Sequence, residues 1–376
     1  MIGYYVHHQG AGHLTRMRAI AAELEMPVWG LSSVPEPAGW ESGWTVLARD
    51  DGPSSEDPRR DSDPTAHGVL HWAPLHHEGL ARRSEQIARW VVEHRPRALV
   101  VDVSAEVALL GRLCGVPTVV VAMPGQRDDR THQMAYDAAD ALLAPWPRGS
   151  HGRDWPSHWV DKAWFVGGFS RFDSLTPAES APADSAPAEP APTERAPAGR
   201  RTVLLLWGAG GRSTNEGQVR SAQEATPGWR WIERSPGTTS SADLWAELQH
   251  ADVVVSHAGQ NAVAEIAAAR RPAVIVAQDR PFDEQGATAR ALERWEIGVG
   301  CPRWPAPQAW PATLELAVAR GGARWSRWST GHGARRAAEH LTALTSGHLT
   351  APTGGHLTAP TGGHLTALTS GARAAS

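Results

Sequence analysis

The sequence predicts an α/β protein made of two doubly wound, Rossmann-like domains that face each other across a cleft. Three observations support this fold class. Short apolar runs alternate with helical patterns along most of the chain, as in parallel sheets covered on both faces. A segment rich in proline and alanine, residues 174–200, interrupts this alternation near its middle. Each half also contains a strand that runs through a glycine-bearing turn into a helix.

Length and composition agree with two domains. The chain has 376 residues, 41% of them hydrophobic, which is enough for two buried cores. Its formal net charge of −4 does not favour nucleic acid or anionic lipid as a partner. The two distant cysteines, Cys114 and Cys301, form neither a disulfide framework nor a zinc-binding motif.

The sequence also bears on location. The first apolar run starts at Ile2 with no basic leader before it, and no run reaches the roughly 18 apolar residues of a membrane-spanning helix. We therefore expect a cytoplasmic protein, with peripheral membrane contact left open.

The first domain is expected to span residues 1–173. Its apolar runs are short and nearly continuous, which is typical of strands buried on both faces of a parallel sheet. They lie at 2–6, 27–31, 44–47, 98–102, 118–122 and 141–144. Helical patterns lie between them at 14–24, 79–94, 104–114 and 132–140.

Residues 174–200 are predicted to be an extended linker, because they contain too few bulky apolar residues to form a core. The second domain is expected to span residues 201–345. Its predicted strands are 202–207, 229–232, 253–255 and 273–276, and its predicted helices are 242–250, 260–269, 284–294, 310–320 and 332–343. Residues 346–376 form a Thr/Gly/Pro-rich repeat tail that we expect to be disordered.

The first glycine-bearing turn contains Gly10, Gly12 and His13. It departs from a dinucleotide fingerprint because Thr15 occupies the third glycine position. No Gly-Lys-Ser/Thr motif follows a glycine-rich loop, which excludes a P-loop. A packing turn capped by a histidine explains the pattern equally simply. In the functional interpretation, the helix dipole disfavours protonation of His13, which leaves it available as a general base.

Asp102 is a rival candidate for that base. It ends a predicted central strand, and its simpler role is to cap the following helix. Arg127 lies in a polar segment after another strand and is a candidate for the acceptor side, although a surface loop explains it as well. The sequence leaves the choice between His13 and Asp102 open.

The second turn, within residues 252–265, is the most informative segment. An apolar run ends in Ser256 and His257, and a helix starts after Gly259 with Gln260 and Asn261. Free backbone N–H groups at such a helix start bind phosphate. Glu265, one turn beyond Asn261 on the same face, is within reach of a ribose diol. A solvated glutamate on an amphipathic helix is the alternative.

Two more polar turns follow strands of the second domain. The first contains Gly208, Gly210, Gly211 and Ser213, whose glycines permit close approach of backbone to a ligand. The other leads into Glu284 and Gln285. All these turns are expected at the C-terminal ends of strands, where open α/β sheets bind ligands.

The segment Ser-His-Ala-Gly-Gln-Asn-Ala-Val-Ala-Glu at 256–265, with Arg-Pro at 271–272 and Pro-Phe-Asp-Glu-Gln at 281–285, resembles the C-terminal domain of glycosyltransferase family 28. That family has the GT-B fold and includes the N-acetylglucosaminyltransferase of the lipid-linked peptidoglycan precursor. The turn at Gly10, Gly12 and His13 is similar to the family's acceptor-side turn, but it lacks the longer run of glycines, so the acceptor stays open.

The resemblance implies roles for individual residues. The backbone from His257 to Asn261 would bind the diphosphate of a nucleotide-sugar donor, and Glu265 would bind its ribose. Glu284 and Gln285 would contact the donor sugar, while residues 208–213 would close over the phosphates. Arg171 is similar to a phosphate-contacting arginine at the family's domain junction, and His13 would be the acceptor-side base.

We therefore expect a glycosyltransferase that uses a UDP-linked sugar and inverts its anomeric centre. No metal ion or cofactor is expected, because the adjacent histidine pairs at 7–8 and 76–77 lack metal-ligand spacing. The acceptor is a lipid-linked, glycan or small-molecule hydroxyl. Two alternatives stay open: a nucleotide-sugar epimerase and a non-catalytic nucleotide-sugar-binding protein of the same fold.

Overall fold

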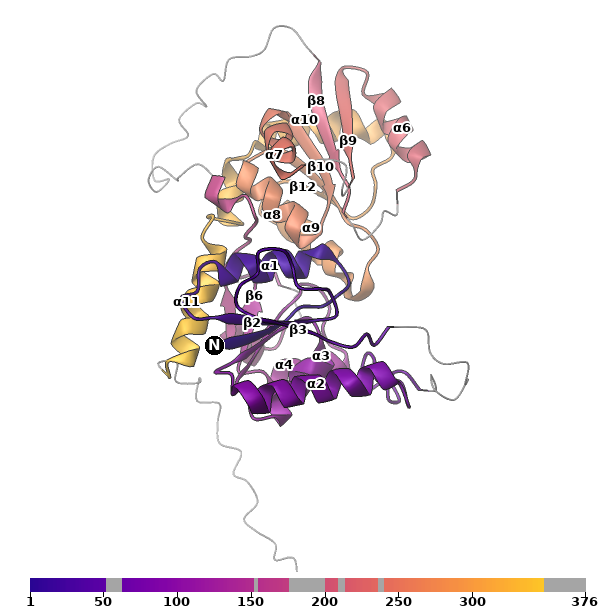
Figure 1. Cartoon of the computed structure of the whole chain (residues 1–376). Coiled ribbons are helices and arrows are strands. Elements are labelled where there is room, and N and C mark those ends of the chain that lie inside the picture. Colours follow the sequence, from indigo (N-terminus) through magenta and orange to yellow (C-terminus); the bar gives the residue numbers. More distant parts are fainter. Residues whose placement is uncertain (52–62, 152–154, 176–199, 209–213, 236–239, 348–376) are drawn as a thin grey trace, which may run out of the picture.

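The computed structural model of the chain describes residues 1–51, 63–151, 155–175, 200–208, 214–235 and 240–347. They form two lobes, and each lobe is built on its own sheet of parallel strands (Figure 1). The prediction of two doubly wound domains is confirmed.

The first lobe contains a seven-stranded sheet with the order β3-β2-β1-β4-β5-β6-β7. Its strands are β1 Ile2–Tyr5, β2 Val28–Ser32, β3 Trp44–Val46, β4 Leu99–Asp102, β5 Thr118–Val121, β6 Ala141–Ala144 and β7 Ala163–Phe165. Its helices are α1 Ala11–Ala21, α2 Glu78–His94, α3 Ala105–Leu113, α4 Arg130–Ala138 and α5 Ser157–Asp161. The central strands β1, β4, β5 and β6 are buried along their whole length, as their valine-rich and leucine-rich runs predict.

The second lobe contains a five-stranded sheet with the order β12-β11-β10-β8-β9. Its strands are β8 Arg201–Leu206, β9 Trp229–Arg234, β10 Val253–His257, β11 Ala273–Val276 and β12 Val299–Cys301. Its helices are α6 Glu216–Ala225, α7 Ser241–His250, α8 Gln260–Ala269, α9 Glu284–Arg294 and α10 Trp310–Arg320. Every predicted strand and helix of this lobe is present, with ends within a few residues of those predicted.

Four elements have no counterpart in the sequence analysis: β7, β12, α5 and α6. The two strands have only three residues each, and α5 has five, so a periodic pattern cannot develop. Helix α6 buries only Val219 and Ala222, but a capping box of Asn215 and Gln218 marks its start. That local signal was available in the sequence.

The last helix, α11 Gly333–Thr345, packs on the first lobe (Figure 1). Ala337 and Leu341 belong to the same buried cluster as Ile2 and Ile20, and His340 stacks on Trp164 with ring centroids 4.9 Å apart. The sequence groups this helix with the second domain because it follows that domain in the chain. Its apolar face instead extends the core of the first lobe.

Some predicted segments lie outside the described residues. These are 176–199 of the predicted linker and 348–376 of the predicted tail. Within the described part of the chain, no helix combines the length and the apolar character needed to cross a membrane.

Both sheets reverse their strand order at one point, between β1 and β4 in the first lobe and between β8 and β10 in the second. Open parallel sheets bind ligands at the carboxyl ends of the strands that flank such a point. Helix α1, which follows β1, faces helices α8 and α9 of the second lobe (Figure 1). The two reversal points therefore face each other across the junction of the lobes.

Candidate active site between the lobes

A cluster of His13, Asp102 and Arg16 lies at the reversal point of the first sheet. Nδ1 of His13 is 2.9 Å from Oδ1 of Asp102. Nη1 of Arg16 donates to both carboxylate oxygens, at 2.7 and 2.8 Å, and the hydroxyl of Tyr4 donates to Oδ2 at 3.4 Å. The carboxylate is completely buried, whereas 17% of the His13 side chain is exposed. His13 is therefore the member of the cluster that a ligand can reach.

The charge state of Asp102 follows from these contacts. Burial by itself raises the pKa of a carboxyl group, but the charge of Arg16 and the contacts of His13 hold the pKa of Asp102 below its ordinary value. Asp102 is thus an ionised hydrogen-bond acceptor that fixes the orientation of the His13 ring. The sequence treated the two residues as rivals for one role, and the structure places them in direct contact.

The backbone beside this cluster has two unusual residues. Gly10, the N-cap of α1, has φ +98°, which only glycine adopts without strain. Val103, directly after Asp102, has φ +66°, a costly conformation for a β-branched residue. Strain at one residue next to a buried ion pair is typical of functional sites.

Two contacts join this cluster to the second lobe. Nη2 of Arg16 donates to Oε1 of Gln260, the first residue of α8, at 2.5 Å. Gly12 lies so close to Asn261 that a Cβ on it would be 3.1 Å from the amide nitrogen of that side chain. The predicted acceptor-side turn and the predicted donor-side turn are therefore neighbours in space.

The turn between β10 and α8 is built around His257. Its ring lies between two glycines, since a Cβ on either Gly208 or Gly259 would come within 2.3 Å of it. Its Nδ1 accepts a hydrogen bond from the backbone N–H of Gly259 at 3.0 Å. Burial, with a smaller contribution from the charge of Arg280, lowers the pKa of His257 to about 4, so it is neutral at physiological pH. The N-cap of α8 is Gly259, which has no side chain that could bond to the N–H groups of the first turn.

Glu265 lies one turn further along α8, in a small pocket between the lobes. Its carboxylate is 2.9 Å from Nε of Arg171, and its side chain is 15% exposed. Burial raises the pKa of Glu265, and the charge of Arg171 offsets part of this rise. Thr15, Arg16, Gln260 and Asn261 line the same pocket. The structure thus brings together four residues predicted for the donor site: Arg171, Gln260, Asn261 and Glu265.

Other predicted donor residues have different surroundings. The hydroxyl of Ser256 is buried and donates to the carbonyl of Leu206, so this side chain joins β10 to β8. Oε1 of Gln285 accepts backbone N–H bonds from Ala258 at 3.2 Å and Gln278 at 3.0 Å. Gln285 therefore links the turns after β10 and β11 through its side-chain oxygen, and its contact with a donor sugar stays a prediction. Gly210, Gly211 and Ser213 lie outside the described residues.

Glu284 and Arg127 meet across the lobes, with 3.7 Å between Oε2 and Nη2. Arg127 is 4% exposed and also donates to the carbonyls of Met123 and Pro124. It therefore fastens the first lobe to the loop before α9 and is not a free surface residue. Burial raises the pKa of Glu284, against the charges of Arg127 and Arg280. Glu284 and His13 line one cavity between the lobes.

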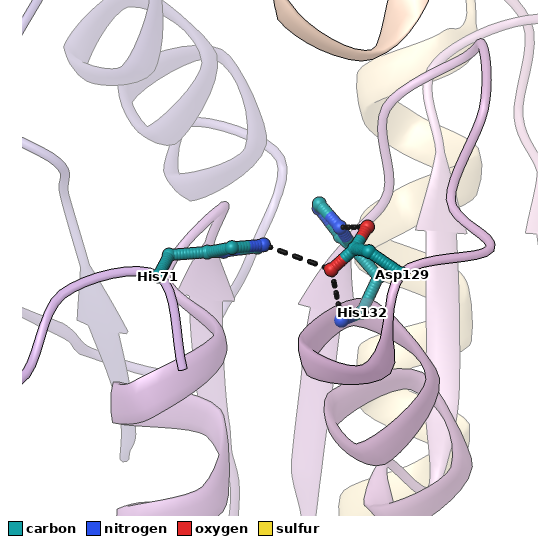
Figure 2. Close-up of side chains that lie close together, drawn as sticks. All are labelled: His71, Asp129 and His132. Carbon is teal, nitrogen blue, oxygen red and sulfur yellow. Dashed lines mark hydrogen bonds and ion pairs between the residues drawn. The ribbon is translucent and has the colours of Figure 1, made fainter. Parts of the chain in front are cut away.

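Two groups of side chains have ligand atoms close enough for a metal ion: His71, Asp129 and His132, and His8, Asp50 and Asp51. In the first group, Asp129 lies between the two rings, 3.0 Å from Nε2 of His71 and 2.5 Å from Nδ1 of His132 (Figure 2). Nη1 of Arg127 is 3.3 Å from the other nitrogen of His132. That nitrogen must accept from the arginine, so Nδ1 carries the proton and is not a metal ligand.

Several residues of the site were not identified from the sequence. Arg16 and Tyr4 bond to Asp102, and His71 and Phe282 line the cavity that His13 lines. Asp129, which belongs to the polar segment of Arg127 that the sequence offers for the acceptor side, bonds to His71. Arg16 lies three positions after His13 in the helix, a spacing that places both on one face and was therefore readable. The others come from separate segments and carry no local signal.

Comparisons with known proteins agree with this geometry. Residues 206–301 match the model of the glycosyltransferase family 28 C-terminal domain. A search of curated protein sequences found no match.

Solved structures match over both lobes. The glycotransferase of kitacinnamycin is 15% identical with a TM-score of 0.62, over 91% of this chain and 98% of that chain. MurG of Acinetobacter baumannii is 14% identical with a TM-score of 0.54, over 92% and 99%. The spinosyn rhamnosyltransferase SpnG, solved with thymidine diphosphate, is 15% identical with a TM-score of 0.50, over 92% and 98%. The second lobe thus matches the glycosyltransferase family 28 C-terminal domain over residues 206–301, and the two lobes together have the GT-B fold.

Proposed function

We propose that the chain transfers a sugar from a nucleoside diphosphate sugar, with UDP as the expected nucleotide, to the hydroxyl group of an acceptor. The observation that carries this proposal is the contact of the two reversal points. The start of α8, suited to a diphosphate, is bonded through Gln260 and Arg16 to the carboxylate that orients His13. A donor held at α8 has its reacting sugar beside a histidine that is able to accept a proton.

The donor site would use the second lobe. Backbone N–H groups at the start of α8 bind the diphosphate and stabilise the negative charge that develops as it leaves. Arg171 adds a positive charge next to Glu265, and Glu265 accepts hydrogen bonds from the ribose hydroxyls. Helix dipole and arginine together supply the charge stabilisation for which other enzymes use a metal ion.

The proton would go to His13. With Nδ1 bonded to Asp102, the lone pair of Nε2 is the basic position of the ring. The acceptor oxygen forms a bond to the anomeric carbon while the bond from that carbon to the diphosphate breaks, and the acceptor proton moves to Nε2. Asp102 stabilises the resulting imidazolium. Attack from the face opposite to the diphosphate inverts the anomeric centre.

The test is calorimetric titration of the protein with UDP, thymidine diphosphate, UDP-glucose and UDP-N-acetylglucosamine, followed by turnover assays with the sugars that bind. Glu265→Ala removes hydrogen bonds to a charged group, so it should weaken binding of the nucleotide by roughly 10-fold to 100-fold. Glu93→Ala on the exposed side of α2 is the matched control and should bind like the wild type.

Each outcome separates this proposal from its alternatives. Interconversion of a free sugar nucleotide with no acceptor present would identify an epimerase. Binding without any hydrolysis or transfer would identify a binding protein. Nucleotide affinity that is equal in the wild type and in Glu265→Ala would rule out the donor site described here.

A further inference from the structure

Two adjoining cavities that share lining residues lie near the proposed base. One, of about 410 Å³, is at the junction of the lobes and is lined by His13 and Glu284 among others. The other, of about 540 Å³, is inside the first lobe. His7, Gln9, His71 and Val103 line both of them. A molecule that presents a hydroxyl to His13 therefore has room to extend into the first lobe.

The junction cavity is neutral and rich in rings. Among the described residues that line it, one guanidinium and one carboxylate occur, those of Arg127 and Glu284, and they pair with each other at 3.7 Å. Arg127 is further occupied by the carbonyls of Met123 and Pro124, so it offers little to a phosphate of an acceptor. Aromatic or imidazole rings contributed by both lobes line the remaining wall: His7, His71, His132, Tyr136 and Phe282.

His7 and His132 add no positive charge to the cavity at physiological pH. Burial, with nearby positive or histidine groups, lowers the pKa of each to about 4, so both rings are neutral at physiological pH. The cavity inside the first lobe is lined by the carboxylates of Asp50, Asp51 and Glu106, and the guanidinium of Arg83 in its wall pairs with Asp50 at 3.1 Å. A diphosphate-linked or polyanionic acceptor would therefore leave water for two cavities with no free cation among their described residues. The lining instead suits a compact, uncharged molecule with a ring system.

His71 is the polar group placed to orient such a molecule. Its Nε2 donates to Asp129 at 3.0 Å, and Asp129 is fixed in turn as the N-cap of α4 (Figure 2). Nδ1 of His71 is then the hydrogen-bond acceptor of the ring, and it has no partner among the described residues. The side chain is 32% exposed and lines both cavities. It is able to accept a hydrogen bond from a second hydroxyl of the ligand.

Phe282 closes this cavity from the second lobe. Its ring centroid is 4.7 Å from that of His132 and 5.4 Å from that of His71, and the Arg127 guanidinium lies 4.9 Å from it. Its carbonyl accepts a bond from the backbone N–H of Gln126 at 2.8 Å, and its φ of +61° is strained. The hydrogen bond to Gln126 of the first lobe therefore holds Phe282 against the cavity. The wall of aromatic and imidazole rings is complete only when the two lobes are in contact.

We propose that the two cavities bind the acceptor, that the acceptor is an uncharged, ring-bearing small molecule with at least two hydroxyl groups, and that His71, oriented by Asp129, positions it. This inference rests on the proposed function. His13 takes the proton of the reacting hydroxyl, and His71 is a positioning residue that holds the other one.

The test compares three coumarins as acceptors with the nucleotide sugar that the wild type hydrolyses. 7-Hydroxycoumarin has one hydroxyl, 6,7-dihydroxycoumarin has two, and 7-hydroxycoumarin-3-carboxylate adds a negative charge. We expect transfer to the first two, with a KM about 10-fold lower for the dihydroxy compound, which corresponds to one additional hydrogen bond. We expect a KM at least 10-fold higher for the carboxylate.

In His71→Ala the KM ratio of the first two coumarins should fall to about one. The matched control, His67→Ala, alters a histidine whose side chain is 92% exposed and should keep the wild-type ratio. Donor hydrolysis without transfer to any coumarin would overturn the acceptor class while leaving the proposed function intact. Neither binding nor hydrolysis of any nucleotide sugar would overturn the proposed function and this inference with it.

A second measurement does not depend on turnover. Nitrogen NMR of labelled histidines should show His71 with its proton on Nε2, and Asp129→Asn should change that signal. Titration of the protein with Zn²⁺ alone tests whether the cluster binds a metal ion instead. One equivalent bound in the wild type but not in His71→Ala would mean that the cluster of His71, Asp129 and His132 is a metal site, and it would overturn the positioning role.

Discussion

Two histidine–aspartate pairs face the same cavity, and they differ in how their carboxylates are held. Asp102 is completely buried and is bonded to His13, Arg16 and Tyr4. Asp129 is 31% exposed and is shared between His71 and His132. The first pair, which we call the fixed pair, has its carboxylate buried against a buried arginine, whereas the second carboxylate caps α4, is shared between two rings and is partly open to solvent. A fully buried carboxylate suits a base that transfers a proton, and a pair that is open to the cavity suits binding of a ligand.

The largest expected effect is that of removing the fixed carboxylate. Asp102→Asn should lower kcat for transfer by roughly 10²-fold to 10⁴-fold, because an amide does not hold His13 in the required tautomer. Asp129→Asn should change kcat much less and act mainly on the KM of the acceptor. Steady-state kinetics of the two variants check this, and equal losses of kcat would erase the functional distinction between the pairs.

The next effect concerns stability. Arg16→Met leaves the buried charge of Asp102 without its main partner, which should cost about 3–5 kcal/mol of unfolding free energy. Arg49→Met is the control, because the Arg49 side chain is 61% exposed and water screens its ion pair with Asp51, so its loss of stability should be much smaller. Urea denaturation measures both. A similar small loss in the two variants would show that Asp102 is not fixed as described.

The pair that contains Asp129 also includes a histidine that responds to pH. Burial lowers the pKa of His132, which lies beside Asp129, to about 4, and it lowers the pKa of His7 and His257 to about the same value. The unfolded chain has histidines with pKa near 6.5. Between about pH 6.5 and 4 the unfolded state therefore binds more protons, and the free energy of unfolding falls as the pH is lowered. Asp173, whose pKa burial raises to about 6, acts in the opposite direction, as do Glu265 and Glu284, whose pKa values burial also raises. Asp102 and Asp129, whose pKa values are lowered, act in the same direction as the histidines.

Urea titrations at about pH 7 and pH 5 should show this loss of stability. His132→Asn should make the difference between the two pH values smaller, since one of the three neutral histidines is removed. A difference that is unchanged or larger would mean that His132 is not kept neutral by its surroundings.

The smallest expected effect is on the contact between the fixed pair and the donor turn. Gln260→Ala removes the bond from Arg16, and the loss of one such bond should weaken donor binding by about 2-fold to 10-fold. Titration with the preferred nucleotide measures it. An unchanged affinity would indicate that the bond between Arg16 and Gln260 does not contribute to donor binding.

Much of the geometry of the proposed donor side was predictable because its signal is local. Gly259 starts α8, and Gln260, Asn261 and Glu265 follow within two turns, so one segment carries both the helix start and the carboxylate on its face. Gln285 was predicted as a sugar contact, and its side-chain oxygen also accepts bonds from the backbone of Ala258 and Gln278. Its partners lie in two other turns, and no sequence pattern around Gln285 predicts them.

The catalytic side shows the same limit. His13 and Asp102 were both identified as candidates, but 89 positions separate them, and nothing in the chain says that they touch. Asp129 belongs to the polar segment considered for the acceptor side, but its partner His71, 58 positions away, and the second-lobe Phe282 were not identified as site residues. Each of these contacts requires loops from different strands to arrive at one edge of a sheet.

The amino-acid order by itself determined the two sheets, the strand-to-helix turns and the family of the second lobe. These depend on apolar periodicity and on glycines at fixed offsets, which act over a few residues. The tertiary structure decided that Asp102 orients His13 instead of competing with it, that α11 returns to the first lobe, and that the ring wall of the cavity comes from both lobes. Burial and pairing of distant side chains set those outcomes, and neither is encoded in any single stretch of chain.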